Sequence, residues 1–198
     1  WTHSLVQGET VIIAGLDKTI FGLDLATGTE LWRLTTDGAV VSTPLMVENT
    51  LYIGTFAKDM EAWDIQTGKQ IWKATLDGIV WGTPLLVGET LYIGDQTGAV
   101  YAVSAKDGRF DKIGSVESPI VASPLLVNER IVIVAENGTI TAFNTNGTSA
   151  WSTTVKGSLY TTPVFDGENL VVAVKDGEFL LVVLDADGKV VRPFAPAK

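Results

Sequence analysis

Few side chains in this chain are suited to catalysis or metal binding. Its 198 residues include no Cys and a single His, His3. The absence of Cys excludes a thiolate nucleophile, a disulfide and a Cys-ligated metal. One unpaired His provides neither a nucleophile–base pair nor a zinc site. We therefore expect His3 to be an exposed residue near the N-terminus rather than a catalytic or channel-lining one.

Two closely spaced pairs of carboxylates remain, Asp59 with Glu61 and Asp185 with Asp187. Carboxylates can ligate Ca²⁺, but neither pair has the spacing of an EF-hand loop. Both pairs lie in or beside predicted turns, where such side chains are solvated or bonded to the local backbone. The sequence thus predicts no catalytic residue, no cofactor and no metal site.

The charge of the chain bears on its partners. A formal net charge of -9 at pH 7 disfavours binding to phosphate backbones, so we expect no nucleic-acid partner. The longest apolar run, around residues 179–184, is much shorter than the roughly 20 residues of a membrane-spanning helix, and we expect no direct membrane insertion of this segment. Because the chain opens at Trp1 without an initiator Met or a signal pattern, we expect a processed product or part of a longer polypeptide.

The elements that must position these side chains repeat about every forty residues. A Ser/Thr-Pro pair followed by an apolar residue begins at positions 43, 83, 123 and 162, and Ser4-Leu5 holds the same place in the first copy. Such a period is typical of repeat architectures. The sequence predicts one domain over residues 1–198 with five repeats, at about 1–40, 41–80, 81–120, 121–160 and 161–198.

Each repeat has the pattern of four short strands. Runs of Val, Ile, Leu, Tyr and Thr alternate with turns rich in Gly, Asn and Asp, and no segment has a helical apolar period. In the second repeat the strands are expected at about 43–47, 51–55, 60–65 and 70–75. A four-stranded sheet of this size cannot bury either face alone, so the repeats must stack face to face. We predict an all-β protein of five four-stranded antiparallel sheets.

The second half of the repeat carries a recognisable motif. Residues 23–32 read Leu-Asp-Leu-Ala-Thr-Gly-Thr-Glu-Leu-Trp, and residues 63–72 are similar. This motif resembles the tryptophan-docking repeat of pyrroloquinoline-quinone-like β-propellers, a family that includes quinoprotein alcohol dehydrogenases and BamB-like outer-membrane assembly proteins. The resemblance implies structural roles between neighbouring blades for the Trp and Gly of three motifs, namely Trp32, Trp72, Trp151, Gly28, Gly68 and Gly147.

The number of repeats leaves two arrangements open. Members of the resembling family are mostly eight-bladed, whereas this chain has five repeats. A closed five-bladed ring is one arrangement, and a five-blade arc of a larger propeller is the other. We expect the ring, because an arc would leave two apolar blade faces exposed to solvent.

The residues around each Ser/Thr-Pro pair give one candidate site. If the first strand of each blade is innermost, they form a rim of aromatic and hydroxyl side chains: Trp1, Trp81, Tyr160, Thr43, Thr83 and Ser123. Amphipathic aromatics suit a surface that binds a peptide or a small ligand. Plain packing between blades is the alternative explanation.

The resemblance also frames the functional alternatives. A quinoprotein dehydrogenase would require adjacent cysteines, a Ca²⁺ site and additional segments between blades, and this chain has no Cys. We therefore predict a non-enzymatic, extracytoplasmic binding or scaffold domain for a protein or peptide partner in a bacterial envelope or membrane-protein assembly complex. The alternative is a small-molecule sensor or a vestigial quinone-binding domain with its ligand in the central channel.

Overall fold

The computed structural model describes residues 4–195 and contains only β structure. Twenty strands form five four-stranded antiparallel sheets, and none of the described residues belongs to a helix. No membrane-spanning helix is therefore present in that part of the chain. The predicted all-β fold of five four-stranded blades is confirmed. We number the blades 1 to 5 in chain order.

The strands of each blade are consecutive in the sequence. Blade 1 contains β1 (Leu5–Gln7), β2 (Thr10–Ala14), β3 (Thr19–Asp24) and β4 (Glu30–Thr35). Blade 2 contains β5 (Leu45–Val47), β6 (Thr50–Gly54), β7 (Asp59–Asp64) and β8 (Lys69–Thr75). Blade 3 contains β9 (Leu85–Val87), β10 (Thr90–Gly94), β11 (Ala99–Ser104) and β12 (Phe110–Ser115). Blade 4 contains β13 (Leu125–Val127), β14 (Arg130–Val134), β15 (Thr139–Asn144) and β16 (Ser149–Thr154). Blade 5 contains β17 (Val164–Phe165), β18 (Asn169–Ala173), β19 (Leu181–Asp185) and β20 (Val190–Phe194).

The turn between the third and fourth strands explains the Asp-x-x-Thr-Gly motif. In blade 1, the Asp24 carboxylate accepts hydrogen bonds from the Thr27 amide and the Thr27 hydroxyl, both at 2.7 Å. These bonds from Thr27 lower the pKa of Asp24 below its ordinary value. Gly28 follows at a φ of 71°, a left-handed conformation that favours Gly. The motif therefore encodes a local turn.

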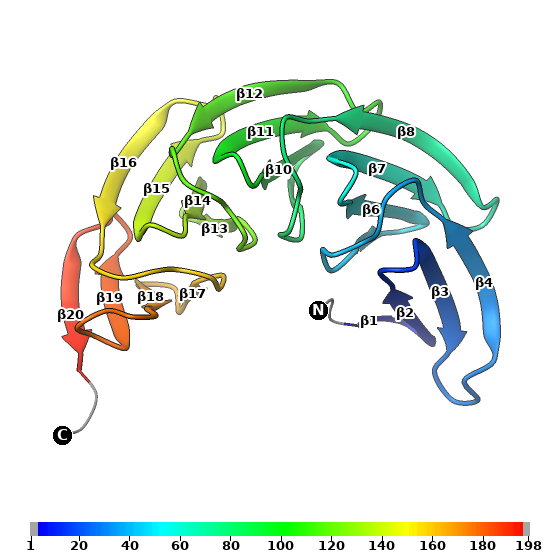
Figure 1. Ribbon diagram of the computed structural model, residues 1–198, viewed down its shortest axis with the longest axis horizontal. Coiled ribbons are helices and arrows are strands. Elements are labelled where there is room, and N and C mark those ends of the chain that lie inside the picture. The colour runs from blue at the N-terminus through cyan, green and yellow to red at the C-terminus, as the bar shows by residue number, and fades with distance from the viewer. Residues whose placement is uncertain (1–3, 196–198) are drawn as a thin grey trace.

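The five blades form an open arc rather than a closed ring (Figure 1). The fourth strands β4, β8, β12, β16 and β20 follow its outer edge, and blade 1 lies apart from blade 5. The expectation of a closed five-bladed ring was wrong, and the alternative of a five-blade arc describes this chain. The rotation from one blade to the next is too small for five blades to close a ring.

Apolar cores lie between successive blades. Ile12 and Ile20 of blade 1 pack with Leu51 and Ile53 of blade 2. Three further cores join blades 2 and 3, blades 3 and 4, and blades 4 and 5. No core among the described residues joins blade 5 to blade 1. Each blade is thus held by its neighbours.

The terminal blades are buried on one face only. In β10 and β14, every residue after the first is buried. In β2, buried Ile12 and Ala14 alternate with half-buried Val11 and exposed Ile13, and β18 shows a similar alternation. Exposed apolar side chains follow on both terminal blades, including Leu16, Leu25, Val190 and Val191. These faces are apolar and have no neighbouring blade within the arc.

Trp72 and Trp151 both contact the following blade. The Trp72 indole N–H donates to the Ala105 carbonyl at 2.9 Å, and that of Trp151 donates to the Ala186 carbonyl at 3.1 Å. Each ring also lies over a glycine of the next turn, since a Cβ added to Gly108 or Gly188 would approach the indole to within 3 Å.

Two other turns are covered differently. Trp32 packs against the core between blades 1 and 2, but a Cβ on Gly68 would meet only Leu34. Ile113 lies over Gly147. No blade precedes the Gly28 turn within residues 4–195, and a Cβ there would meet no atom within 4 Å.

Gly108 and Gly28 form a matched pair for testing this packing. Their φ angles are 72° and 71°, so the backbone strain of an Ala should be the same at both. Only at Gly108 would the new methyl group collide with a Trp. We expect Gly108→Ala to lower the free energy of unfolding by about 1–3 kcal/mol more than Gly28→Ala, as measured by urea denaturation. Equal losses would contradict the indole–glycine contact.

Truncation of Trp72 tests the same contact by removing the indole instead of enlarging the glycine. Trp72 is buried and packs 5.9 Å from the Tyr52 ring, centroid to centroid. We expect Trp72→Ala to cost about 3 kcal/mol or more through lost burial and a cavity between blades. The control is Lys69→Ala at an exposed position of the same strand, β8, which should cost less than about 0.5 kcal/mol. A smaller shift for Trp72→Ala than for the control would refute the role of Trp72.

Candidate functional site

The Ser/Thr-Pro segments lie immediately before the first strand of blades 2 to 5. Proline fixes φ and has no N–H to pair, which suits the entry to a strand at the edge of a sheet. The preceding hydroxyl residues link one blade to the next. The Thr83 amide donates to the Ser123 hydroxyl at 2.8 Å, and the Ser123 amide donates to the Thr162 hydroxyl at 2.9 Å.

A cavity of about 610 Å³ opens on this rim. Five of the six predicted rim residues line it together: Thr43, Trp81, Thr83, Ser123 and Tyr160. The sixth, Trp1, lies outside the described residues. The lining also includes Thr161, a hydroxyl residue that the sequence places on the same rim, and residues that the sequence did not single out as site residues, namely Val41, Gly82, Val121, Ala122, Glu136 and Thr162.

The fold does not require a side chain as large as that of Trp81 at its position. Its ring packs edge to face on Phe56, with centroids 5.1 Å apart. Its indole nitrogen is buried without a hydrogen-bond partner in the described part of the chain, and such a donor costs about 1–3 kcal/mol. Val41 and Val121 hold the equivalent positions in blades 2 and 4. Because Val fills this position without that cost, packing alone does not explain a Trp.

Glu136 reaches the cavity from the turn between β14 and β15. The backbone of Glu136 is fixed by its neighbours, because its amide donates to the Pro119 carbonyl at 2.9 Å and its carbonyl accepts from the Leu159 amide at 3.3 Å. Tyr160, the residue after Leu159, also lines the cavity; it is 44% exposed and its ring lies 5.3 Å from the Lys175 ammonium. The cavity therefore combines two aromatic rings, several hydroxyls and one carboxylate.

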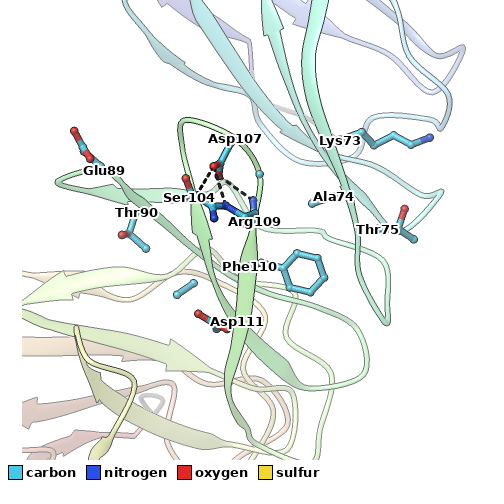
Figure 2. Close-up of a pocket in the computed structure, with 12 residues that line it drawn as sticks. Lys73, Ala74, Thr75, Glu89, Thr90, Ser104, Asp107, Arg109, Phe110 and Asp111 are labelled. Carbon is cyan, nitrogen blue, oxygen red and sulfur yellow. Dashed lines mark hydrogen bonds and ion pairs between the residues drawn. The ribbon is translucent and has the colours of Figure 1, made fainter.

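A second hollow lies on the outer side of the arc, between β8 of blade 2 and strands β11 and β12 of blade 3 (Figure 2). Its volume is about 930 Å³. Asp107 bonds the Arg109 guanidinium at 2.8 Å, which lowers the pKa of Asp107 to about 2. Lys73 pairs with Asp37 at 2.7 Å. Asp107, Arg109 and Lys73 are thus paired within the protein. The inner rim, where a buried indole nitrogen has no hydrogen-bond partner among the described residues, is the stronger candidate site.

The two carboxylate pairs noted in the sequence do not form a metal site. Among residues 4–195, no three His, Asp or Glu side chains lie close enough together to hold an ion. Asp185 accepts bonds from the Asp187 and Lys189 amides of its own turn. Asp187 pairs with Arg130 at 2.7 Å. This pair is explained by local and surface interactions.

The interpretation of Asp59 and Glu61 as solvated turn residues was wrong. Both belong to β7 and are buried, with exposed fractions of 4% and 0%. Asp59 accepts from the Thr75 hydroxyl at 2.7 Å. One carboxylate oxygen of Glu61 accepts from the Trp63 indole at 2.7 Å, while the other has no partner in the described region. Burial raises the pKa of Glu61 above its ordinary value.

Comparison with known proteins supports the fold and indicates a family. The family model described as outer membrane protein assembly factor BamB matches residues 1–119 and 59–192. The crystal structure of BamB from Moraxella catarrhalis superposes with a TM-score of 0.81 over 96% of this chain, at 17% sequence identity. The computationally designed Ika8 protein superposes with a TM-score of 0.82 over 97% of the chain, at 19% identity.

These two structures are similar to the chain in fold alone, and the chain spans 62% of the length of each. No curated protein matches the sequence significantly.

The buried Glu61 predicts a pH dependence of stability. Its raised pKa means that the folded protein keeps a proton that the unfolded chain releases at lower pH. This group's contribution to the free energy of unfolding should therefore fall as pH rises from the ordinary glutamate pKa through the raised one. Glu61→Gln keeps an oxygen acceptor for Trp63 and should remove that fall. Urea denaturation across this pH window checks it, with exposed Glu48→Gln as control. An unchanged pH profile in Glu61→Gln would contradict the assignment.

Proposed function

The chain belongs to the family of the outer membrane protein assembly factor BamB, and we propose on this basis that it is a non-enzymatic scaffold domain that binds another protein. Its binding site is the inner rim of the arc, at the cavity between Trp81 and Tyr160. The partner is a protein or peptide of an envelope or membrane-protein assembly complex. The domain works outside the cytoplasm, in the periplasm or at the cell surface.

One observation carries the choice of this site. Blades 2 and 4 show that Val suffices where blade 3 has Trp81, yet the Trp is retained with an unpaired buried indole nitrogen. Tyr160 lines the same cavity and is partly exposed. Aromatic residues of this kind are enriched at the centres of protein interfaces. Binding explains these two aromatics better than packing does.

A small-molecule ligand is the second candidate. The cavity of about 610 Å³ lies within the range of roughly 300–1,000 Å³ that is typical of ligand pockets, and its walls are aromatic. The five blades form an open arc, however, so no ring encloses the inner rim (Figure 1). An open, hydroxyl-lined rim suits a segment of a partner protein better than a small molecule that must be buried.

Photo-crosslinking in the native host tests the proposed function. A photo-reactive amino acid at position 160 should crosslink to a protein of outer-membrane assembly, whereas one at exposed Glu168, outside the cavity lining, should not. Trp81→Val should lower the yield about fivefold or more, because it removes an aromatic anchor while keeping a side chain that the fold accepts. Equal yields at positions 160 and 168, or a yield unaffected by Trp81→Val, would reject the rim as the binding site.

A quinone titration distinguishes the function of a scaffold domain from that of a vestigial quinone-binding domain. We expect no saturable micromolar binding of pyrroloquinoline quinone in the presence of Ca²⁺, and no dye-linked alcohol oxidation. The chain has no adjacent cysteines, and the segments that connect successive blades, residues 36–44, 76–84, 116–124 and 155–163, contain no inserted element. A redox quinone needs a stacking platform, a cation at its carbonyl oxygens and a base for the substrate. Binding with turnover would overturn the non-enzymatic function, and binding alone would favour the sensor.

A further inference from the structure

One wall of the rim cavity carries an acidic group that the protein itself does not use. Glu136 lines the cavity and is partly buried. Its carboxylate has no hydrogen bond or ion pair with another residue of the described chain. The backbone of Glu136 is nevertheless held in place by Pro119 and Leu159. The backbone of Glu136 is therefore fixed, and its partly buried carboxylate is available to pair with a ligand.

The aromatic walls suit the same kind of ligand as this carboxylate. The faces of Trp and Tyr rings attract cations, and this attraction strengthens when water is partly excluded. Tyr160 already lies 5.3 Å from the ammonium group of Lys175. Lys175 is not part of the cavity lining, and its side chain is 67% exposed. Its ion pair with exposed Asp176 spans 4.0 Å, and exposed pairs of this kind contribute little, so another cation can displace Lys175 from the Tyr160 ring.

The overall charge of the protein acts in the same direction. A net charge of -9 attracts basic segments and repels acidic ones, which raises the rate of encounter with a cationic partner. Thr83, Ser123 and Thr162 line the same cavity, and a hydroxyl oxygen can accept more than one hydrogen bond.

We propose that the rim cavity takes the side chain of an arginine from the partner protein, with its guanidinium paired to Glu136 and stacked against Trp81 or Tyr160. Arginine is favoured over lysine because its planar group pairs with a carboxylate and stacks on an aromatic ring at the same time. This inference rests on the proposed function, since it names the chemistry by which the rim recognises its partner.

Nuclear magnetic resonance of the whole chain tests this directly. The probes are the peptide acetyl-Ala-Arg-Ala-amide and the same peptide with neutral citrulline in place of arginine. The arginine peptide should shift the amide signals of Gly82, Ser123 and Glu136 saturably, and the citrulline peptide should bind about tenfold or more weakly. Glu136→Gln should weaken binding of the arginine peptide to a similar extent. Lys175→Met should strengthen it by removing a competing cation.

The matched control is Glu168→Gln, an exposed change of the same charge outside the cavity lining, which should leave binding within about twofold of the original. An unchanged spectrum away from the rim establishes that Glu136→Gln is folded. Equal binding of the two peptides would overturn the arginine site but leave the rim as a peptide-binding surface. A rim that responds to neither peptide would also overturn it, while the crosslinking experiment would still decide the proposed function. Arginine-selective binding without any crosslink would support the site and reject the proposed partner.

Discussion

The structure depends on one constraint: a four-stranded blade cannot bury either of its faces without a neighbour. The second strands of the inner blades 3 and 4, β10 and β14, are buried on both faces. The second strands of the terminal blades, β2 and β18, are buried on one face. Stability therefore resides in the four cores between blades. Trp72 and Trp151 extend these contacts to the outer turns of blades 3 and 5 through their indole hydrogen bonds. The apolar outer faces of blades 1 and 5 are the direct consequence of an arc that does not close.

The same stacking creates the candidate site. Because each blade begins at the inner edge, the segments before β5, β9, β13 and β17 come together there, although they are about forty residues apart in the sequence. The hydrogen bonds from Thr83 to Ser123 and from Ser123 to Thr162 fix their spacing. The side chains one or two positions earlier, including Trp81 and Tyr160, are then free to differ between blades. A rigid repeat thus presents a variable rim.

The repeat motifs predicted the strands and the blades, because these depend on local patterns that recur in every copy. Five of the six predicted rim residues line one cavity, and their role in binding stays a prediction. The choice between ring and arc could not be predicted, since it depends on the small rotation between successive blades rather than on any residue type. Glu136 was missed because its Glu-Asn-Gly sequence indicates only a hairpin turn. Its place at the rim depends on contacts between blades, such as the hydrogen bond from the Leu159 amide to the Glu136 carbonyl. Burial of Glu61 was missed because the closely spaced Asp59 and Glu61 were interpreted as residues in or beside a solvated turn.

Native-state hydrogen exchange of the whole chain tests the central constraint most directly, because it measures the local free energy of opening strand by strand. If blades are stabilised by their neighbours, the amides of β10, β11 and β14 should be the most protected, and those of β2 and β18 should exchange at least about tenfold faster. Equal protection across all five blades, or greater protection in blade 1 than in blade 3, would contradict a structure held together by its interfaces between blades.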